Sequence, residues 1–140
     1  MKGLTSAYLA GLIDGEGSIG IMKAKRKNST NLIPYLIITN TDKNLIDQLN
    51  LALKEYHPQI ISKQGWKKIC YQIRMQGQQL RGLFMRIQPY LIIKKRHCEE
   101  VIGFINHRIF LGTHHLYTNS DWTSFQTLRI LNQRTGRNYK

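Results

Sequence analysis

Two carboxylates separated by a single residue directly follow an apolar run near the N-terminus. Residues 8–13 read YLAGLI, and Asp14-Gly15-Glu16-Gly17 follows them. The apolar run predicts a helix, and the two glycines predict its end. A helix C-terminus presents unpaired carbonyls and a partial negative charge, which disfavours each nearby carboxylate by about 0.3–1 kcal/mol. Carbonyl and carboxylate oxygens together suit a hard divalent cation, so Asp14 and Glu16 are candidate metal ligands, with solvated turn residues as the alternative.

The chain carries a large excess of positive charge. Its 140 residues include 21 Lys and Arg against 8 Asp and Glu, a formal net charge of +13. Such an excess favours a polyanionic partner, first nucleic acid and second an anionic membrane surface. No apolar run reaches the ~20 residues that span a bilayer, and the N-terminus lacks the long apolar segment of a signal peptide. Cys70 and Cys98 are isolated, so no zinc ribbon or disulfide framework is indicated. These features predict an intracellular nucleic-acid-binding protein without membrane association.

The elements that must position the carboxylates follow from the spacing of apolar residues. The first half of the chain predicts a helix capped at Thr5 or Ser6, then a hairpin that becomes steadily more basic towards its tip, then a second helix that ends before Pro58. The expected bounds are residues 5–14 for the first helix, 17–27 and 32–39 for the strands, 28–31 for their turn, and 40–56 for the second helix.

The second half predicts another hairpin and three helices. In the hairpin of residues 60–76, apolar residues alternate with polar and basic ones, so one face is expected in the core. The expected core positions are Ile69, Tyr71, Ile73 and Met75. The helices are expected at residues 78–87, from after 94 to about 110, and within the tail, where Ser120 or Asp121 would be the cap. The inward positions are Leu80, Leu83, Phe84 and Ile87 in the first of these helices and Cys98, Val101, Ile102, Ile105 and Ile109 in the second.

No linker interrupts this pattern, which predicts one α+β domain over residues 1–140. Its core would be an αββαββα arrangement over about residues 1–111. Residues 112–140 would form a basic helical extension that either adds nucleic-acid contacts or packs on the core. The basic residues at its end are Arg129, Arg134, Arg137 and Lys140.

Residues 9–17, LAGLIDGEG, resemble the namesake motif of the LAGLIDADG homing endonucleases, with Gly15-Glu16 where the name has Ala-Asp. The resemblance extends through the αββαββα order to about residue 110, and residues 87–91 followed by Lys94 also match the family's pattern. It implies a saddle-shaped antiparallel sheet over the DNA major groove and Mg²⁺ as cofactor. It identifies Glu16 as the metal-binding carboxylate, with the Gly15 carbonyl beside it.

The resemblance also implies two further catalytic positions. Asn40, at the end of the second strand, would hold water or metal, with Lys43 as a neighbouring candidate and a helix cap as the alternative role for Asn40. Lys94 would be the active-site lysine, although a lysine there could otherwise neutralise phosphates. Asp14 is expected to have a structural role near the dimer axis.

Family members with one copy of the motif are homodimers, and this chain has one copy. Ala7, Gly11 and Gly15 recur every four residues, so one face of the first helix has almost no side-chain bulk. Such a face lets two backbones approach closely, which favours Ala7 and Gly11 as the dimer interface. Packing of this helix on the sheet within one subunit is the alternative.

DNA would be read from the outward faces of the two hairpins. Arg suits guanine and Gln suits adenine, so base contacts are expected from Arg26, Gln64, Gln72 and Arg74. Phosphate contacts, which position without specifying, are expected from Lys23, Lys25, Lys27, Lys63, Lys67 and Lys68.

The resulting hypothesis is a site-specific homing endonuclease. It would make Mg²⁺-dependent double-strand breaks with 3′ overhangs in a long, near-palindromic DNA target. The alternative is a non-cleaving binding protein on the same fold, either an RNA maturase or a DNA-binding regulator. A ribosomal-type RNA-binding protein would leave the two carboxylates without a role.

Overall fold

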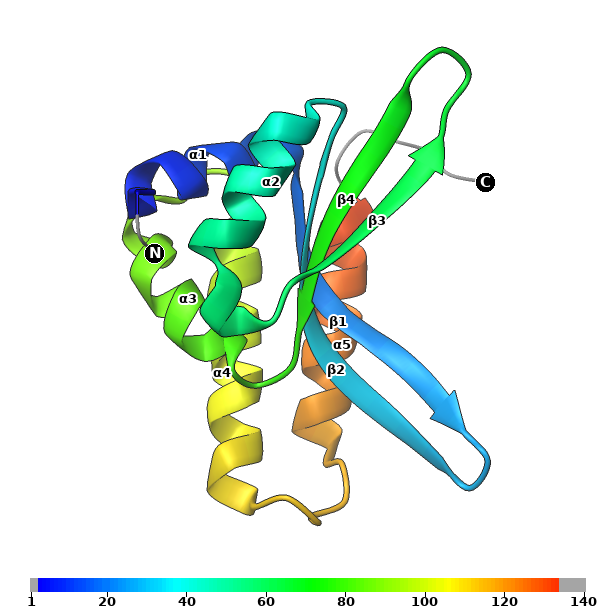
Figure 1. Ribbon diagram of the computed structural model, residues 1–140. Helices are drawn as coiled ribbons and strands as arrows, with labels where there is room; N and C mark the ends of the chain where they lie inside the picture. Colours follow the sequence, from blue (N-terminus) through cyan, green and yellow to red (C-terminus); the bar gives the residue numbers. More distant parts are fainter. Residues whose placement is uncertain (1–2, 134–140) are drawn as a thin grey trace.

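A four-stranded antiparallel sheet divides the molecule into a helical layer and an open face (Figure 1). The computed structural model describes residues 3–133. The strand order is β1-β2-β4-β3, so both hairpins join neighbouring strands and β1 and β3 form the edges. The strands are β1 Gly17–Arg26, β2 Ser29–Asn40, β3 Gln59–Gln64 and β4 Ile69–Gln76.

The helices follow the order expected from the sequence, αββαββα with additional C-terminal helices, and this prediction is confirmed. They are α1 Ser6–Glu16, α2 Lys43–Ala52, α3 Leu80–Ile87, α4 Lys95–Leu111 and α5 Asn119–Gln133, with short 3-10 turns at Lys54–Tyr56 and Gln88–Tyr90. Thr5 caps α1 by accepting the backbone N–H of Tyr8 at 3.1 Å. No helix among the described residues is both long and apolar enough to cross a membrane.

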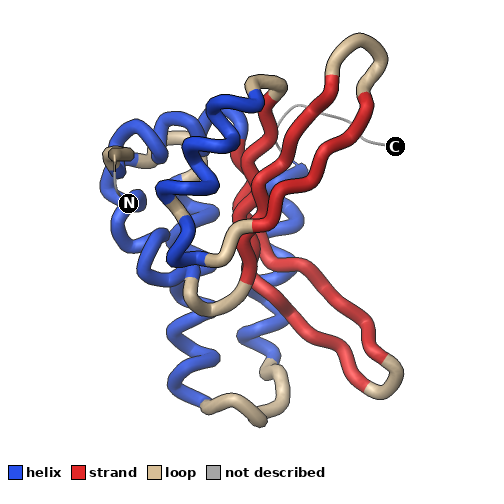
Figure 2. Tube along the Cα trace, viewed as in Figure 1, coloured by secondary structure: helices blue, strands red, loops and turns tan. Residues whose placement is uncertain are grey.

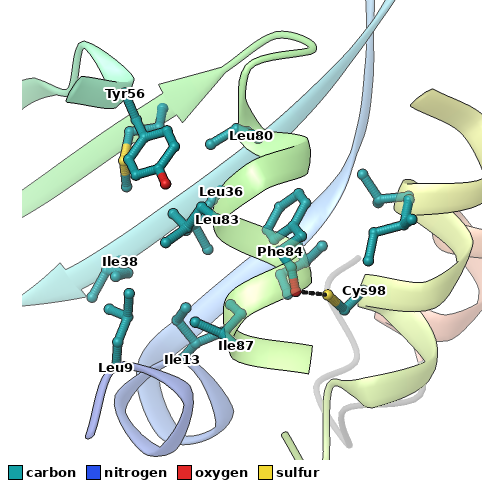
Figure 3. Close-up of a cluster of buried hydrophobic side chains, with 14 of the residues drawn as sticks. Leu9, Ile13, Leu36, Ile38, Tyr56, Leu80, Leu83, Phe84, Ile87 and Cys98 are labelled. Carbon is teal, nitrogen blue, oxygen red and sulfur yellow. Dashed lines mark hydrogen bonds between the residues drawn. The ribbon is translucent and has the colours of Figure 1, made fainter. Parts of the chain in front are cut away.

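Strand register determines which side chains form the core. Leu36 of β2 lies opposite Ile19 of β1 and Met75 of β4, and Ile38 lies opposite Ile73. Because cross-strand partners point to the same face, these residues form one apolar layer. The helices cover that layer, and Figure 3 shows how their side chains interdigitate with it. The four predicted inward residues of α3 are all buried there, which confirms them: Leu80, Leu83, Phe84 and Ile87.

Two predicted core positions are wrong. Ile109 is 54% exposed because the last turns of α4 extend beyond the end of α3 (Figure 1). Ile69 is 43% exposed because it begins β4 near the hairpin tip, away from the helical layer (Figure 2). The first hairpin also has a shorter turn than expected, since β2 begins at Ser29 rather than at residue 32.

The segment after α4 packs into the same core. Phe125 and Leu128 of α5 join the buried cluster, and α5 lies against β1 and α4. The predicted cap of this helix is wrong: Thr118 Oγ1 accepts the N–H of Asp121, and the Asp121 carboxylate accepts the N–H of Thr118, a reciprocal capping pair. The basic end predicted for the tail, Arg134, Arg137 and Lys140, lies outside the described residues.

Asp121 also holds α5 to α4 through a buried ion pair. Its side chain is 1% exposed, and its Oδ2 lies 2.9 Å from Nη1 of the buried Arg108. Burial alone would raise the pKa of Asp121, but hydrogen bonds from the Thr118 N–H, His107 and Arg108 outweigh it and leave the pKa lowered. Residues 112–133 are therefore tied to the domain by both apolar and ionic contacts.

Candidate active site and nucleic-acid interface

The side chains of Glu16 and Asn40 meet where α1 and β2 end. Asn40 Nδ2 donates a hydrogen bond to Glu16 Oε2 at 2.5 Å. The Asn40 Oδ1 accepts the backbone N–H of Asp42 at 2.7 Å, and Asp42 caps α2 by accepting the N–H of Leu45. The helix cap is thus Asp42, and Asn40 is held with its NH₂ group towards the carboxylate.

Asp14, two residues earlier in the chain, is engaged differently. Its carboxylate accepts three backbone N–H groups: Ile92 at 2.8 Å, Ile93 at 3.1 Å and Lys94 at 2.9 Å. These amides lead directly into α4, so the carboxylate lies at the positive end of that helix dipole. This contact offsets the unfavourable position of Asp14 at the end of α1. The geometry gives Asp14 a structural task, the anchoring of the segment that enters α4.

Lys94 occupies the N-cap position of α4, and the residue as a whole is only 7% exposed. Among residues 3–133, no carboxylate lies within ion-pair distance of Lys94. An ammonium group that has no carboxylate partner is suited to an anionic ligand such as phosphate. Because Asp14 binds the backbone of Lys94, the end of α1 positions both Glu16 and Lys94.

Lys43 lies outside this arrangement of contacts. Its Nζ pairs with Asp47 Oδ2 at 2.9 Å, one turn along the exposed surface of α2. The hydrogen bond to Asp47 raises the pKa of Lys43, so the group is a stable cation at neutral pH. The structure therefore offers Asn40, rather than Lys43, as the partner of Glu16.

The oxygens at the end of α1 fit Mg²⁺ as part of a larger ligand set. Glu16 is exposed, and the carbonyl of Gly15 belongs to the last helical turn, where carbonyls lack intrahelical partners. Within the described chain, His, Cys, Asp and Glu do not gather in any group of three that could hold a metal ion. Mg²⁺ commonly keeps several waters and takes one or two carboxylates plus substrate phosphates. One carboxylate with a neighbouring carbonyl fits such a site.

The sheet register sorts the predicted DNA-contacting residues onto two faces. The face that carries Ile19, Leu36 and Ile73 packs against the helices, whereas the opposite face is free of helices (Figure 1). Alternation along the strands assigns four of the predicted residues to this open face. They are Arg26 on β1, Lys63 on β3, and Gln72 and Arg74 on β4.

Lys23, Lys25 and Gln64 have the opposite parity and belong to the helical side of the sheet. Lys23 lies opposite the buried Leu32, and its Nζ is 6.0 Å from the ring centroid of Phe125 on α5. The basic run in β1 is therefore divided between two faces. Its composition alone did not indicate this, because the face taken by each position depends on where the helices pack.

Both hairpins extend past the body of the sheet, and their tips diverge (Figure 2). Lys27 lies in the turn between β1 and β2, and Lys67 and Lys68 lie in the turn between β3 and β4. Trp66 at the second tip is 92% exposed, and Lys67 Nζ lies 4.5 Å from its ring centroid. The projecting ends of the two hairpins, the basic arms, place positive charge at both ends of the open face.

Sequence reasoning missed the contribution of β2 to the open face. Its odd-numbered positions alternate with buried residues, a signal that was present in the sequence. The ring of Tyr35 lies over Gly20, where a Cβ would come within 2.6 Å of the tyrosine oxygen, so a side chain at Gly20 would displace the ring. The open-face residues of β2 next to the centre of the sheet are Ile33, Tyr35, Ile37 and Thr39, and Asn31 and Ser29 continue the same face towards the hairpin tip.

The outer face of α1 is free within one subunit. Ala7, Tyr8, Gly11 and Gly15 are exposed, while Leu9, Ala10 and Ile13 of the same helix are buried. A Cβ added at Gly11 or Gly15 would meet no atom within 4 Å, so nothing in the described chain requires glycine there. Packing within the described chain therefore does not explain the small residues of this face.

A helical layer on a four-stranded antiparallel sheet, with a LAGLIDADG-like motif at the end of α1, matches the LAGLIDADG homing endonuclease fold. Residues 4–88 match the family of LAGLIDADG-like domains, and the chain belongs to this family.

Solved structures of homing endonucleases share the fold. The archaeal intron-encoded homing endonuclease I-Vdi141I, complexed with DNA, is 19% identical, with a TM-score of 0.74 over 96% of this chain and 88% of that one. The homing endonuclease I-CvuI, in complex with the I-CreI target in the presence of Mg and with the DNA not cleaved, is 15% identical, with a TM-score of 0.66 over 96% of this chain and 85% of that one. No curated protein matches the chain.

Proposed function

We propose that the protein is a site-specific homing endonuclease that makes metal-dependent double-strand breaks in DNA. The observation that carries this proposal is the convergence at the end of α1, where Glu16 is exposed beside Asn40 and Asp14 anchors the buried Lys94. A protein that only bound nucleic acid would need the basic arms but not this group. Structural relatives that are homing endonucleases in complex with DNA support the same reading.

Glu16 and the Gly15 carbonyl would hold Mg²⁺, which when bound supplies an activated water and charge stabilisation at the phosphate. Asn40 would orient solvent and the Glu16 carboxylate through its NH₂ group. Lys94 would stabilise the charge that develops on the phosphate, because its backbone is held by Asp14 and a preorganised cation acts strongly there. Asp14 would keep Lys94 in place without touching the substrate.

We infer that two copies act together as a homodimer, with the small face of α1 at the two-fold axis. Ala7 and Gly11 are exposed and allow close approach of two helix backbones. One Glu16 from each copy would then serve one DNA strand, which accounts for a double-strand break. A two-fold axis also implies a near-palindromic target, and 3′ overhangs are expected for cleavage across the minor groove.

The test is a cleavage selection. The parent protein and Glu16→Gln are each incubated with a randomised plasmid library and Mg²⁺, with EDTA as a control. Site-specific linearisation by the parent alone, with Glu16→Gln still binding the selected site, supports the nuclease. Equal behaviour of the two proteins would refute it, and binding without cleavage by the parent would indicate a non-cleaving maturase or regulator.

A further inference from the structure

Gln72 and Arg74 lie two residues apart on β4 and are joined on the open face of the sheet. Arg74 donates from Nε at 3.0 Å and from Nη2 at 2.7 Å, both to Oε1 of Gln72. The amide must face Arg74 with its oxygen, because its NH₂ group would set donor against donor. Two hydrogen bonds to one acceptor fix the plane of the guanidinium.

We propose that these two residues form one reading unit, in which Arg74 recognises a guanine and Gln72 positions Arg74 instead of reading an adenine. The proposal rests on the proposed function and specifies which base the open face selects. It differs from the expectation drawn from residue types alone, in which Gln72 and Arg74 would each read a base.

The remaining donors of Arg74 match guanine. A guanidinium has five N–H groups, and Gln72 accepts two of them, from Nε and Nη2. One N–H of Nη2 and both of Nη1 are left, and these form the outer edge of the fork. Two parallel donors on that edge suit the O6 and N7 acceptors of guanine, the commonest specific arginine contact in the major groove.

The side-chain amide of Gln72 has no free acceptor with which to bind adenine in a bidentate contact. A bidentate contact with adenine needs the amide oxygen to accept from N6 and the amide nitrogen to donate to N7. The oxygen of Gln72 already accepts two hydrogen bonds from Arg74. Breaking them would release the guanidinium from its fixed orientation, so the two contacts compete.

The place of Arg74 in the sheet favours a base over a phosphate. β4 is an inner strand, and Arg74 lies opposite Ile37 on β2 and Gln59 on β3, away from both hairpin tips. Arg74, Tyr35 and Ile37 line the same hollow. No carboxylate in the described part of the chain pairs with Arg74, so its full charge faces the open side.

The experiment is a binding selection from randomised duplex DNA with Ca²⁺ in place of Mg²⁺, so that it does not require cleavage. Every base of the selected site is then varied, and the affinities of the parent, Arg74→Lys, Gln72→Ala and Gln72→Glu are compared. The parent is expected to prefer guanine at one position of each half-site by roughly 5- to 150-fold. Arg74→Lys should remove most of that preference at that position alone.

The Gln72 variants separate positioning from direct reading. Gln72→Ala should weaken the same guanine preference and alter no other position, whereas Gln72→Glu, which retains the acceptors, should preserve it. Loss of an adenine preference elsewhere in Gln72→Ala, with guanine unaffected, would overturn the proposal. An equal loss of affinity for all sequences in Arg74→Lys, with a shallower salt dependence, would identify a phosphate contact and also overturn it.

The test distinguishes failure of this proposal from failure of the proposed catalysis. A protein that selects guanine through Arg74 but never cuts would refute the proposed catalysis and leave the reading unit intact. A protein that cuts its target but shows no guanine preference that depends on Arg74 would support the proposed catalysis and refute the reading unit. Failure to select any sequence would overturn the reading unit.

Discussion

Removal of one negative charge at the end of α1 should mainly lower stability at Asp14 and mainly lower cleavage activity at Glu16. Each change, Asp14→Asn and Glu16→Gln, replaces a carboxylate by its amide within the same helical turn. Asp14 accepts three backbone N–H groups, whereas Glu16 is exposed and accepts the side chain of Asn40. We expect the first change to destabilise the fold and the second to remove chemistry.

The magnitude for Asp14 follows from its contacts. Hydrogen bonds to a charged group contribute about 1.5–3 kcal/mol each, and neutral ones about half as much. An amide oxygen in the place of Oδ1 can still accept from Ile93 and Lys94, but the amide nitrogen would face the N–H of Ile92 donor to donor. These differences amount to about 3–6 kcal/mol for buried hydrogen bonds. Because the bonds from Ile92 and Ile93 are exposed to solvent, Asp14→Asn should cost about half of that, about 2–3 kcal/mol, which is a decrease in Tm of roughly 5–12 °C.

Glu16→Gln should leave stability unchanged or raise it by up to about 1 kcal/mol, since it removes a negative charge from a helix C-terminus. Its cleavage rate should fall by roughly 10²–10³-fold or more, with DNA affinity in Ca²⁺ retained. Asp14→Asn should also cut more slowly, by up to about 10²-fold, because Lys94 loses part of its anchor. Its loss of stability distinguishes it from Glu16→Gln.

The measurements are thermal unfolding, affinity for a selected target in Ca²⁺ and single-turnover cleavage in Mg²⁺. An unchanged Tm for Asp14→Asn would refute the anchoring role drawn from its three hydrogen bonds. A large decrease in Tm for Glu16→Gln would show that this carboxylate is structural, and its loss of cleavage would then say nothing about metal binding.

Three further outcomes are expected. Gly11→Val should convert the proposed dimer to a monomer in sedimentation without lowering the Tm of the subunit, whereas Gly103→Val on α4, an equally open helical glycine, should leave the oligomeric state unchanged. Asp121→Asn should destabilise the protein by about 3–5 kcal/mol at pH 7, because it leaves Arg108 buried without a counter-charge. The pKa of Asp121 is lowered in the folded protein, so its carboxylate contributes its full stabilisation of the fold above the unfolded-state pKa of about 3.9. This contribution is lost as the pH falls through the lower folded-state pKa. Denaturant titrations should therefore show the free energies of unfolding of the parent and Asp121→Asn converging at acidic pH. If about ten phosphates are neutralised per dimer, log affinity should fall with log salt at a slope near −9, and a slope shallower than about −3 would contradict DNA binding by the basic arms.

The sequence alone determined the order of elements and the identity of the acidic helix end. Alternating and helical apolar spacing are local properties, so strands and helices could be predicted where the pattern was strong, as in α3 and β2. The glycines after residue 14 indicated where α1 ends, and the unfavourable charge there indicated that something must compensate it. The excess of lysine and arginine predicted the class of partner.

The tertiary structure decided which partner each charge has. Residue type alone leaves Asp14 and Glu16 equivalent, and the family resemblance separated them only by their places in the motif, but the entry to α4, nearly eighty residues away, supplies amides to Asp14 alone. Lys23 and Arg26 belong to one basic run, and alternation along β1 puts them on opposite faces of the sheet, but only the packing of α5 and the other helices decided which of these faces is covered. These assignments depend on long-range contacts, for which local spacing carries no signal. The sequence therefore predicted an acidic site at the end of α1 and a structural role for Asp14, and the fold showed that this carboxylate anchors the entry to α4 while Glu16 stays the candidate metal ligand.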